Sequence, residues 1–399
     1  MGEHLELPSE QLLVEVPGQL RVRYREFDEG RFSGHDTSAC SSAGCTAKNT
    51  RRYANIRAPG STDVTAIADQ PTGLRQAQEI ADQVFFPAAA AVDGSDRLPV
   101  SHLDLLAERG FYALAAPPHL STLGLPDFAS VCRVIETLAS GCLTTTFVWA
   151  QHHNAVMAAA NTQNEALKEE FLEPLAAGRR RSGLAIGAAV RPGPAAVRAT
   201  AVDGGYLLDG DAPWVSGWGL VDTLYVAGRD ADDTLVWALV DAVESGSLSV
   251  QPLALTAVNA SSTVTVSFRE HFVPASRISG TMPLEAWRQR DPATLRFNGS
   301  LALGVAARAI ALTGSEELAK QLDTTRGFLD VSDPDTMPQA RAAASHLALR
   351  ACAALAVSEG SRAVLRGQHA QRLVREATFL LVFGSRPGIR SALTSALTP

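Results

Sequence analysis

Two adjacent histidines, His152 and His153, are the side chains in this sequence best suited to proton transfer. They lie within TTTFVWAQHHNAVMAAANT, a segment that predicts a helix apolar on nearly all sides. Because the imidazole pKa lies near neutral pH, such a histidine can act as a general acid or base. A histidine on an apolar helix face is more often structural, with its nitrogens satisfied by hydrogen bonds. The sequence leaves both interpretations open.

The cysteines could bind a metal or exchange disulfides, but their spacing favours neither. There is no CxxC pair, which argues against a zinc ribbon and a redox dithiol. His35 with Cys40 and Cys45 fits no standard ligand spacing and lacks a fourth ligand. We therefore expect reduced cysteines and no metal site. The five residues are Cys40, Cys45, Cys132, Cys142 and Cys352.

Composition excludes several classes of protein. The 399 residues are 46% hydrophobic and 19% charged, which is typical of a globular chain with room for two or three domains. The net charge of −7 disfavours nucleic-acid binding, which requires a positive face. No apolar run reaches the roughly 18–20 residues of a membrane span, and the N-terminus does not resemble a secretory signal. We expect a cytoplasmic protein.

The period of the apolar residues divides the chain into four parts. Residues 1–68 are mostly polar and aperiodic, which predicts an irregular, poorly ordered extension. Residues 69–180 have helical spacing, with an expected break at Pro87. Residues 181–279 switch to period two between turn signals, which predicts a central antiparallel β-barrel or sandwich. Residues 280–399 return to long helices, which predict a C-terminal four-helix-type bundle.

This order of helices, strands and helices resembles the acyl-CoA dehydrogenase superfamily. The segment FFPAAAAVDGSDRLPVSHLDLLAERGFYALAAPP (85–118) is similar to the family's opening helices. DGGYLLDGDAPWVSG (203–217) matches its Gly-Tyr-x-Leu-x-Gly-x-x-x-Trp-[Ile/Val/Phe]-[Thr/Ser] strand pair. REATFLLVFGSRPGIRSAL (375–393) lies where the family has its last helix and the turn beside the flavin. The resemblance covers about 70–399 and implies a FAD-binding oxidoreductase.

The resemblance also implies which residues contact the flavin ring. Trp214 corresponds to the aromatic side chain against the isoalloxazine, and Ser216 to the hydroxyl near flavin N5. Leu184, Ala185 and Ile186 correspond to residues whose backbone groups reach the pyrimidine edge. The segment around them, SGLAIGAAVRPGPAAVRA, lacks the family's Thr-Glu and Gly-Ser-Asp side chains.

Arg326 falls near the position of an arginine that, in this family, binds the FAD diphosphate of a neighbouring subunit. The family's partner glutamine is replaced, with Met337 where it would fall. Arg326 could equally be a solvated cation at a helix end. The resemblance implies a homo- or hetero-oligomer, either a dimer or a tetramer.

The carboxylate base of acyl-CoA dehydrogenation has no counterpart here. The reaction needs a glutamate beside the weakly acidic α-proton of the substrate. Phe383 occupies the usual glutamate position before Gly384-Ser385, and Thr294 lies near the family's alternative position. Glu376 is expected to form a surface ion pair with Arg372 or Arg375.

Three functions therefore remain. The first is oxidation of CH–CH bonds in an acyl-CoA-like substrate of lipid metabolism, with an electron-acceptor protein as a possible partner. The second is a flavin-dependent monooxygenase on the same fold, which needs no carboxylate base. The third is a non-catalytic subunit of a heterotetrameric dehydrogenase.

Overall fold

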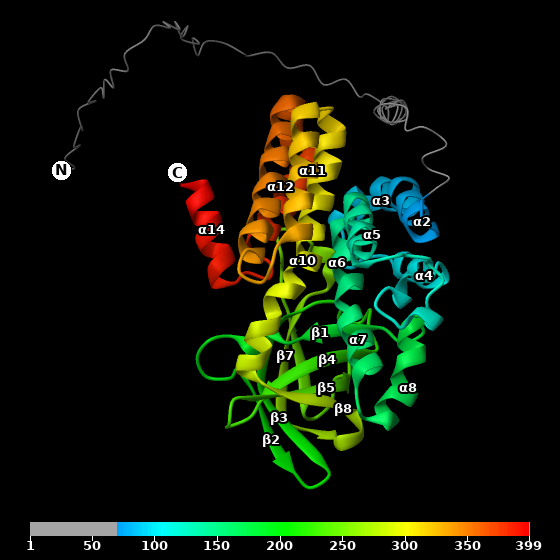
Figure 1. Cartoon of the computed structure of the whole chain (residues 1–399), viewed down its shortest axis with the longest axis vertical. Helices are drawn as coiled ribbons and strands as arrows, with labels where there is room; N and C mark the ends of the chain where they lie inside the picture. The colour runs from blue at the N-terminus through cyan, green and yellow to red at the C-terminus, as the bar shows by residue number, and fades with distance from the viewer. Residues whose placement is uncertain (1–69, 399) are drawn as a thin grey trace, which may run out of the picture. The chain divides into compact units, whose positions relative to one another are not determined.

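A computed structural model describes residues 70–398, which belong to one compact unit of the chain. The order of helices, sheet and helices confirms the predicted fold class (Figure 1). The expectation of a poorly ordered segment at 1–68 lies outside the described residues, as do His35, Cys40 and Cys45.

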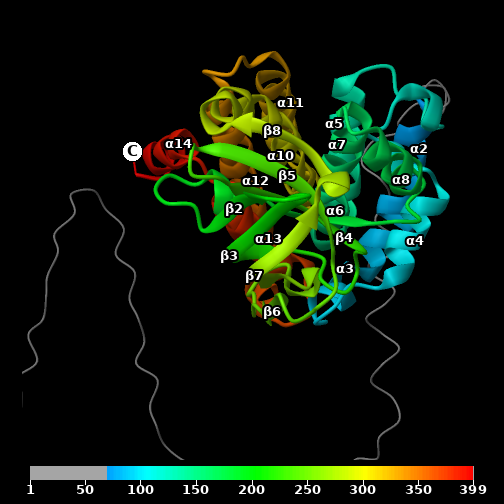
Figure 2. The same ribbon diagram turned by 90° about the horizontal axis from the view of Figure 1, so that it is seen from below.

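The N-terminal helices lie against each other and beside the sheet (Figures 1 and 2). Asn164 caps the last of them, its side chain accepting a hydrogen bond from the Leu167 N–H. The helices are α2 (Thr72–Ile80), α3 (Phe86–Asp93), α4 (Val100–Glu108), α5 (Phe128–Gly141), α6 (Leu143–Gln151), α7 (His153–Asn161) and α8 (Glu165–Ala176).

The expected break at Pro87 is wrong, because a π-helical turn carries the chain from α2 into α3. This turn, η1, spans Ala81–Phe85, and the Phe86 N–H donates to the carbonyl of Ala81, five residues earlier. Pro87 then lies in the first turn of α3, directly after the wide turn, where a residue without an N–H is tolerated. One wide turn thus accommodates a residue that would otherwise end the helix.

An eight-stranded sheet forms the centre of the unit, in the order β6-β7-β3-β2-β4-β5-β8, with β1 also paired to β4. Most neighbours are antiparallel, as predicted, but β1 and β2 both run parallel to β4. The strands are β1 (Ser182–Ala185), β2 (Val197–Val202), β3 (Gly205–Val215), β4 (Thr223–Arg229), β5 (Thr234–Asp241), β6 (Leu248–Pro252), β7 (Val264–Pro274) and β8 (Ile278–Pro283).

The parallel pairings arise because β1 and β2 lie end to end along one edge of β4. β1 pairs with residues 223–226 of β4, and β2 reaches the same strand at Arg229. Between them the chain forms α9 (Gly187–Val190), where period two predicts a continued strand. Alanine favours helices and is depleted in strands, so the Ala-rich sequence here takes a helical turn.

Five helices follow the sheet. Gly314 ends the first of them in the left-handed conformation, at φ 69°, and Ser315 caps the next through a hydrogen bond from the Leu318 N–H. The helices are α10 (Leu284–Thr313), α11 (Glu316–Val331), α12 (Met337–Glu359), α13 (His369–Val382) and α14 (Pro387–Leu397).

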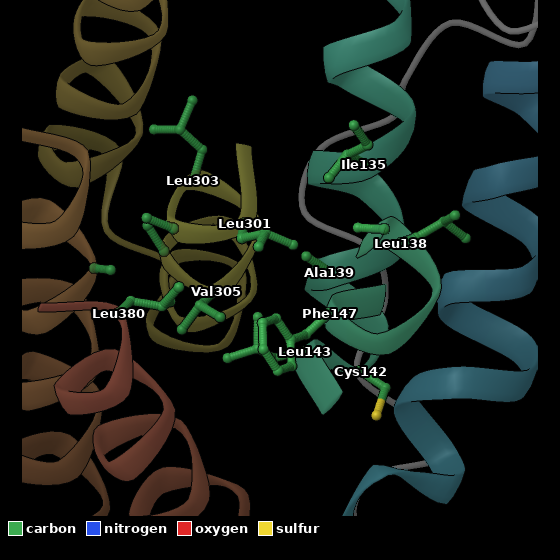
Figure 3. Close-up of a cluster of buried hydrophobic side chains, with 14 of the residues drawn as sticks. Ile135, Leu138, Ala139, Cys142, Leu143, Phe147, Leu301, Leu303, Val305 and Leu380 are labelled. Atoms are coloured by element: carbon green, nitrogen blue, oxygen red, sulfur yellow. The ribbon is translucent and has the colours of Figure 1, made fainter. Parts of the chain in front are cut away.

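Helix α10 joins the two helical regions into one core. Figure 3 shows Leu301 and Val305 of α10 between Leu138 of α5 and Leu380 of α13. Gly304 allows the close approach, because a Cβ there would lie 2.3 Å from the backbone oxygen of Glu136 on α5. Among the described helices, α10 alone is long and apolar enough to cross a membrane. However, 67% of its apolar window is buried, as expected for a core helix.

Candidate functional site

Trp214 projects from β3 at an irregularity of the sheet. The register between β3 and β7 shifts between Ala212 and Val215, and Trp214 lies inside this bulge at φ 68°. A left-handed backbone is unfavourable for a bulky residue and often marks a functional constraint. The side chain is 58% exposed, so a broad apolar face of the indole is open. Such a face can stack on a planar aromatic ligand.

Ser216 follows directly and begins a chain of buried hydroxyl groups. Its Oγ lies 2.8 Å from Oγ1 of Thr263, which in turn lies 2.7 Å from Oγ of Ser261. All three residues are buried. Each hydroxyl can donate one hydrogen bond and accept others, so Thr263 and Ser261 can orient the hydroxyl proton of Ser216.

The β1 segment offers backbone groups at an unpaired edge. Among the described strands β1 pairs with β4 alone, so its second edge is not occupied by another strand. Leu184 and Ala185 lie on β1, and Ile186 follows it and packs with Trp237 and Trp287. The Ser182 N–H already donates to His152 and the Gly183 carbonyl accepts from the Ser182 hydroxyl, so a ligand at this edge would hydrogen-bond the strand beyond these two residues.

Arg326 is engaged within the chain. Its guanidinium binds both carboxylate oxygens of Glu136, with Nη2 2.5 Å from Oε1 and Nε 3.1 Å from Oε2. It also pairs with Asp323 on its own helix. Arg326 is therefore not a solvated helix-end cation, and two carboxylates neutralise its charge. Its predicted role toward a diphosphate stays a prediction.

Phe383 lies at the C-terminal end of α13 in an aromatic cluster. Its ring stacks on Phe379 at 5.4 Å and meets Phe147 of α6 edge to face at 5.0 Å. At the second position considered for a base, the Thr294 hydroxyl donates to the carbonyl of Asp291. Neither position carries a carboxylate, and the surroundings of Phe383 are aromatic.

Two arginines that sequence analysis missed hold the turn after α13. Arg341 of α12 is fully buried, and its Nη2 lies 3.2 Å from the Leu380 carbonyl oxygen and 3.5 Å from that of Phe383. Burial lowers the pKa of Arg341 to about 10. Arg386 binds Asp291 of α10 through two hydrogen bonds of 2.5 and 2.9 Å. Nothing in their sequence context distinguishes these cations from surface residues.

The two histidines lie in different surroundings. Nδ1 of His152 accepts from the Ser182 N–H at 3.1 Å, so Nε2 carries the proton and donates to the Leu175 carbonyl at 3.1 Å. Desolvation lowers the pKa of His152 to about 3, which keeps it neutral. Because both nitrogens are occupied, the structure favours the structural interpretation of His152.

His153 is equally buried, but neither ring nitrogen has a hydrogen-bond partner among residues 70–398. Its ring meets Trp149 edge to face at 4.6 Å. Burial holds the pKa of His153 well below its usual value, so this imidazole is also neutral. The catalytic interpretation thus remains open for His153 alone.

Glu376 pairs with Arg372 as expected, at 2.6 Å, but the pair is buried and not on the surface. The expectation of a surface pair is wrong because this face of α13 packs into the core. An i, i+4 ion pair has the same spacing in the sequence whether it lies on the surface or in the core. One carboxylate oxygen of Glu376 bonds Arg372, whereas Oε2 is buried with no hydrogen-bond partner among the described residues, and burial raises the pKa of Glu376.

The three described cysteines, Cys132, Cys142 and Cys352, are buried free thiols, as expected for reduced cysteines. Desolvation raises the pKa of the Cys132 thiol to about 11. Within residues 70–398 no cluster of three or more His, Cys, Asp or Glu could hold a metal ion.

The residues around Trp214 fit an isoalloxazine ring, whereas those around Arg326 do not fit a diphosphate. Trp214 offers an open aromatic face and Ser216 an oriented hydroxyl, next to a strand edge in need of partners. At the diphosphate end, Arg326 already has two carboxylate partners. The fit therefore rests on the strand side of the site.

Comparison with protein families and curated proteins gives consistent relatives. The family described as Acyl-CoA dehydrogenase, N-terminal domain, matches residues 68–179. The mitochondrial short-chain specific acyl-CoA dehydrogenase of Bos taurus is 24% identical over 249 residues, which cover 59% of this chain and 60% of the relative. Benzylmalonyl-CoA dehydrogenase of Aromatoleum aromaticum is 28% identical over 244 residues, with 57% and 63% covered. The match thus spans less than two thirds of either relative.

Solved structures share the fold over a larger part of the chain. Butyryl-CoA dehydrogenase from Megasphaera elsdenii superposes with a TM-score of 0.70 at 16% identity, covering 82% of this chain and 97% of that chain. The FAD complex of PigA gives a TM-score of 0.69 at 16% identity, with 83% and 97% covered. At this identity the likeness establishes the fold.

Proposed function

Because the chain belongs to the acyl-CoA dehydrogenase superfamily, we propose that it is a FAD-dependent oxidoreductase acting on CH–CH bonds of an acyl-CoA-like substrate. The observation that carries this proposal is the open indole face of Trp214, held out by a left-handed backbone in the β3 bulge. A soluble chain rarely exposes a tryptophan at such strain without a ligand or partner to cover it. The FAD complex of PigA, which has the same fold, supports the choice of cofactor.

Each residue of the strand side then has a defined task. Trp214 would stack on the ring system, the Ser216 hydroxyl would hydrogen-bond its central edge, and the β1 backbone would satisfy its polar edge. Bound FAD would supply the acceptor for a hydride from the substrate. The chain itself orients the ring and excludes water from it.

On the helical side, Phe147, Phe379 and Phe383 form an apolar wall against which an acyl chain can lie. No carboxylate occupies the Phe383 position to remove an α-proton. We therefore expect slow oxidation of simple saturated acyl-CoAs, with the preferred substrate carrying a more acidic C–H bond.

The same aromatic wall favours a second candidate, a flavin-dependent hydroxylase. That reaction joins an oxygen atom from O2 to the substrate and releases the other as water, with reduced flavin as the electron source. It requires apolar surroundings more than a carboxylate, and the aromatic cluster supplies apolar side chains.

The decisive experiment begins with the visible absorbance of purified protein, which reports bound oxidised flavin. Anaerobic titration with a panel of acyl-CoAs then measures bleaching of that absorbance, and oxygen uptake with reduced flavin tests the hydroxylase. We expect bound flavin in wild-type protein and loss of flavin from Trp214→Ala. Protein that binds no FAD even when FAD is supplied would refute both candidates and favour a non-catalytic subunit.

We further propose a cytoplasmic homo- or hetero-oligomer that transfers electrons to an acceptor protein. Sedimentation of the full chain tests the assembly, and reoxidation of reduced protein by added electron-transfer flavoprotein tests the acceptor.

A further inference from the structure

Helices α11 and α12 lie side by side (Figure 1), and a hollow of about 230 Å³ lies between them, open to the surface. Its polar lining consists of Gln321, Thr324 and Thr325 from α11 with His346 and Arg350 from α12. No carboxylate lines it, although the Gln321 amide donates to Glu317 at 2.9 Å. Ala343 and Leu347 also line the hollow, which is therefore partly apolar and carries the positive charge of Arg350.

Arg350 is exposed, and it forms no hydrogen bond or ion pair with any of residues 70–398. His346 lies close enough to sense its charge. Burial, and then the Arg350 charge, lower the pKa of His346. The two groups therefore repel each other when both are protonated, and an anion between them would relieve that repulsion.

Other arginines of the bundle are already engaged. Arg326 is bound by Glu136 and Asp323, and Arg296 pairs with Asp330 at 2.5 Å. Arg341 donates to the last carbonyls of α13. Arg350 differs from these three in combining a free guanidinium with a hollow beside it.

We propose that the hollow between α11 and α12 binds a phosphate group through Arg350, with His346 as a second donor. A guanidinium presents a planar fork of N–H groups that matches two phosphate oxygens. His346 donates one further N–H, and its protonation becomes favourable once the anion is bound. The site is separate from the indole face of Trp214 and does not depend on the proposed oxidoreductase function. The phosphate belongs either to free orthophosphate or to a nucleotide coenzyme.

Calorimetric titration of the full chain with inorganic phosphate, AMP and ADP distinguishes these sources. A nucleotide source gives tighter binding of AMP or ADP than of phosphate, and a free-phosphate source gives the reverse. Arg350→Gln is expected to weaken the tightest of the three by about tenfold or more, as for loss of a charge-assisted hydrogen bond. Arg366→Gln, another exposed arginine of the bundle, is the matched control and leaves binding unchanged. The ligand should also raise the pKa of His346, measured by NMR.

Arg326→Gln separates this site from the role that family resemblance suggests for Arg326. We expect it to lower the melting temperature through loss of the Glu136 pair and to leave phosphate affinity unchanged. Weakening by Arg326→Gln but not by Arg350→Gln would overturn the assignment. Absence of binding of all three probes, or equal effects of Arg350→Gln and Arg366→Gln, would also overturn it. Flavin retention that depends on Trp214 would survive any of these failures, so the two proposals fail separately.

Discussion

Trp214 on the sheet and Phe383 on the helical side lie in opposite physical surroundings. Trp214 is mostly exposed, its backbone is left-handed, and its ring makes no aromatic contact with the described residues. Phe383 packs against two other rings, and its carbonyl accepts from the buried Arg341. The strand side is thus open and strained, whereas the helical side is closed and tied into the core.

This contrast separates side chains whose role is to contact a ligand from side chains that stabilise the folded protein. An exposed side chain at strained φ contributes little to folding, so its value lies in what it contacts. Buried charges and packed aromatic rings near α13 contribute to folding, and removal of one member of a buried ion pair leaves its partner unpaired. Substitutions on the strand side should therefore change ligand retention, and those on the helical side should change stability.

The largest expected effect comes from Phe383→Glu. A carboxylate at this position supplies a general base, which typically contributes about 10²–10⁴-fold in rate. We expect little turnover of saturated acyl-CoAs by wild type with an artificial electron acceptor, and measurable turnover by the variant. Phe379→Glu, one turn earlier in the same cluster, should give no gain. Robust wild-type turnover would mean that another residue is the base.

Glu376→Ala tests the stabilising side directly. It leaves Arg372 buried without its carboxylate, and we expect the free energy of unfolding to fall by about 3–5 kcal/mol. Urea titration followed by circular dichroism measures the change. Glu285→Ala removes an exposed i, i+3 pair with Arg288 and should cost less than about 1 kcal/mol. Equal losses in the two variants would contradict the buried pair.

His152 should make stability depend on pH. Its pKa in the folded protein, about 3, lies below the ordinary value of 6.5, so the unfolded chain binds the proton more readily. The contribution of neutral His152 to the free energy of unfolding is therefore complete above about pH 6.5. It is lost as the pH falls toward 3, at about 1.4 kcal/mol per pH unit. Urea titrations across this range should show that the free energy of unfolding of His152→Gln depends less steeply on pH than that of wild type. His119→Gln, at an exposed position, should keep the wild-type slope.

The smallest expected change in stability belongs to Trp214→Ala. We expect flavin affinity to fall about tenfold, which corresponds to the contribution of one aromatic stacking contact. The free energy of unfolding of the flavin-free protein should change by less than about 1 kcal/mol. Trp214→Gly should be slightly more stable than Trp214→Ala, because glycine accepts the left-handed backbone. A large loss of stability in the alanine variant would place Trp214 in the core and remove the contrast with Phe383.

Periodicity predicted the order of helices and strands well, since apolar spacing encodes which face of an element is buried. It failed where local geometry decides. The π-helical turn before Pro87 and the helical turn of α9 depend on how the chain fits against its neighbours. The parallel pairing of β1 and β2 with β4 is likewise a tertiary property.

The candidate site could be predicted only in part. The motif around Trp214 placed the aromatic residue on a strand, but tryptophan carries no preference for positive φ that would reveal the bulge. Arg341 and the buried state of Glu376 could not be predicted, because a charged residue on a helix looks the same in sequence whether it faces water or the core. The neutral state of His152 comes from its burial, and its hydrogen bonds join it to Ser182 and Leu175, which are distant in sequence.

The shared core around α10 has a consequence for how the protein unfolds. One hydrophobic cluster runs from Ala77 of α2 through α5 and α10 to Leu393 of α14. The helices before the sheet and those after it therefore cannot separate without exposing both halves of this cluster. They should form a single cooperative unit, with slow hydrogen exchange in α5 and α10 reporting the same global opening. The N-terminal helices match a family model of their own, but without α10 and the helices after it they would contain only part of the hydrophobic cluster.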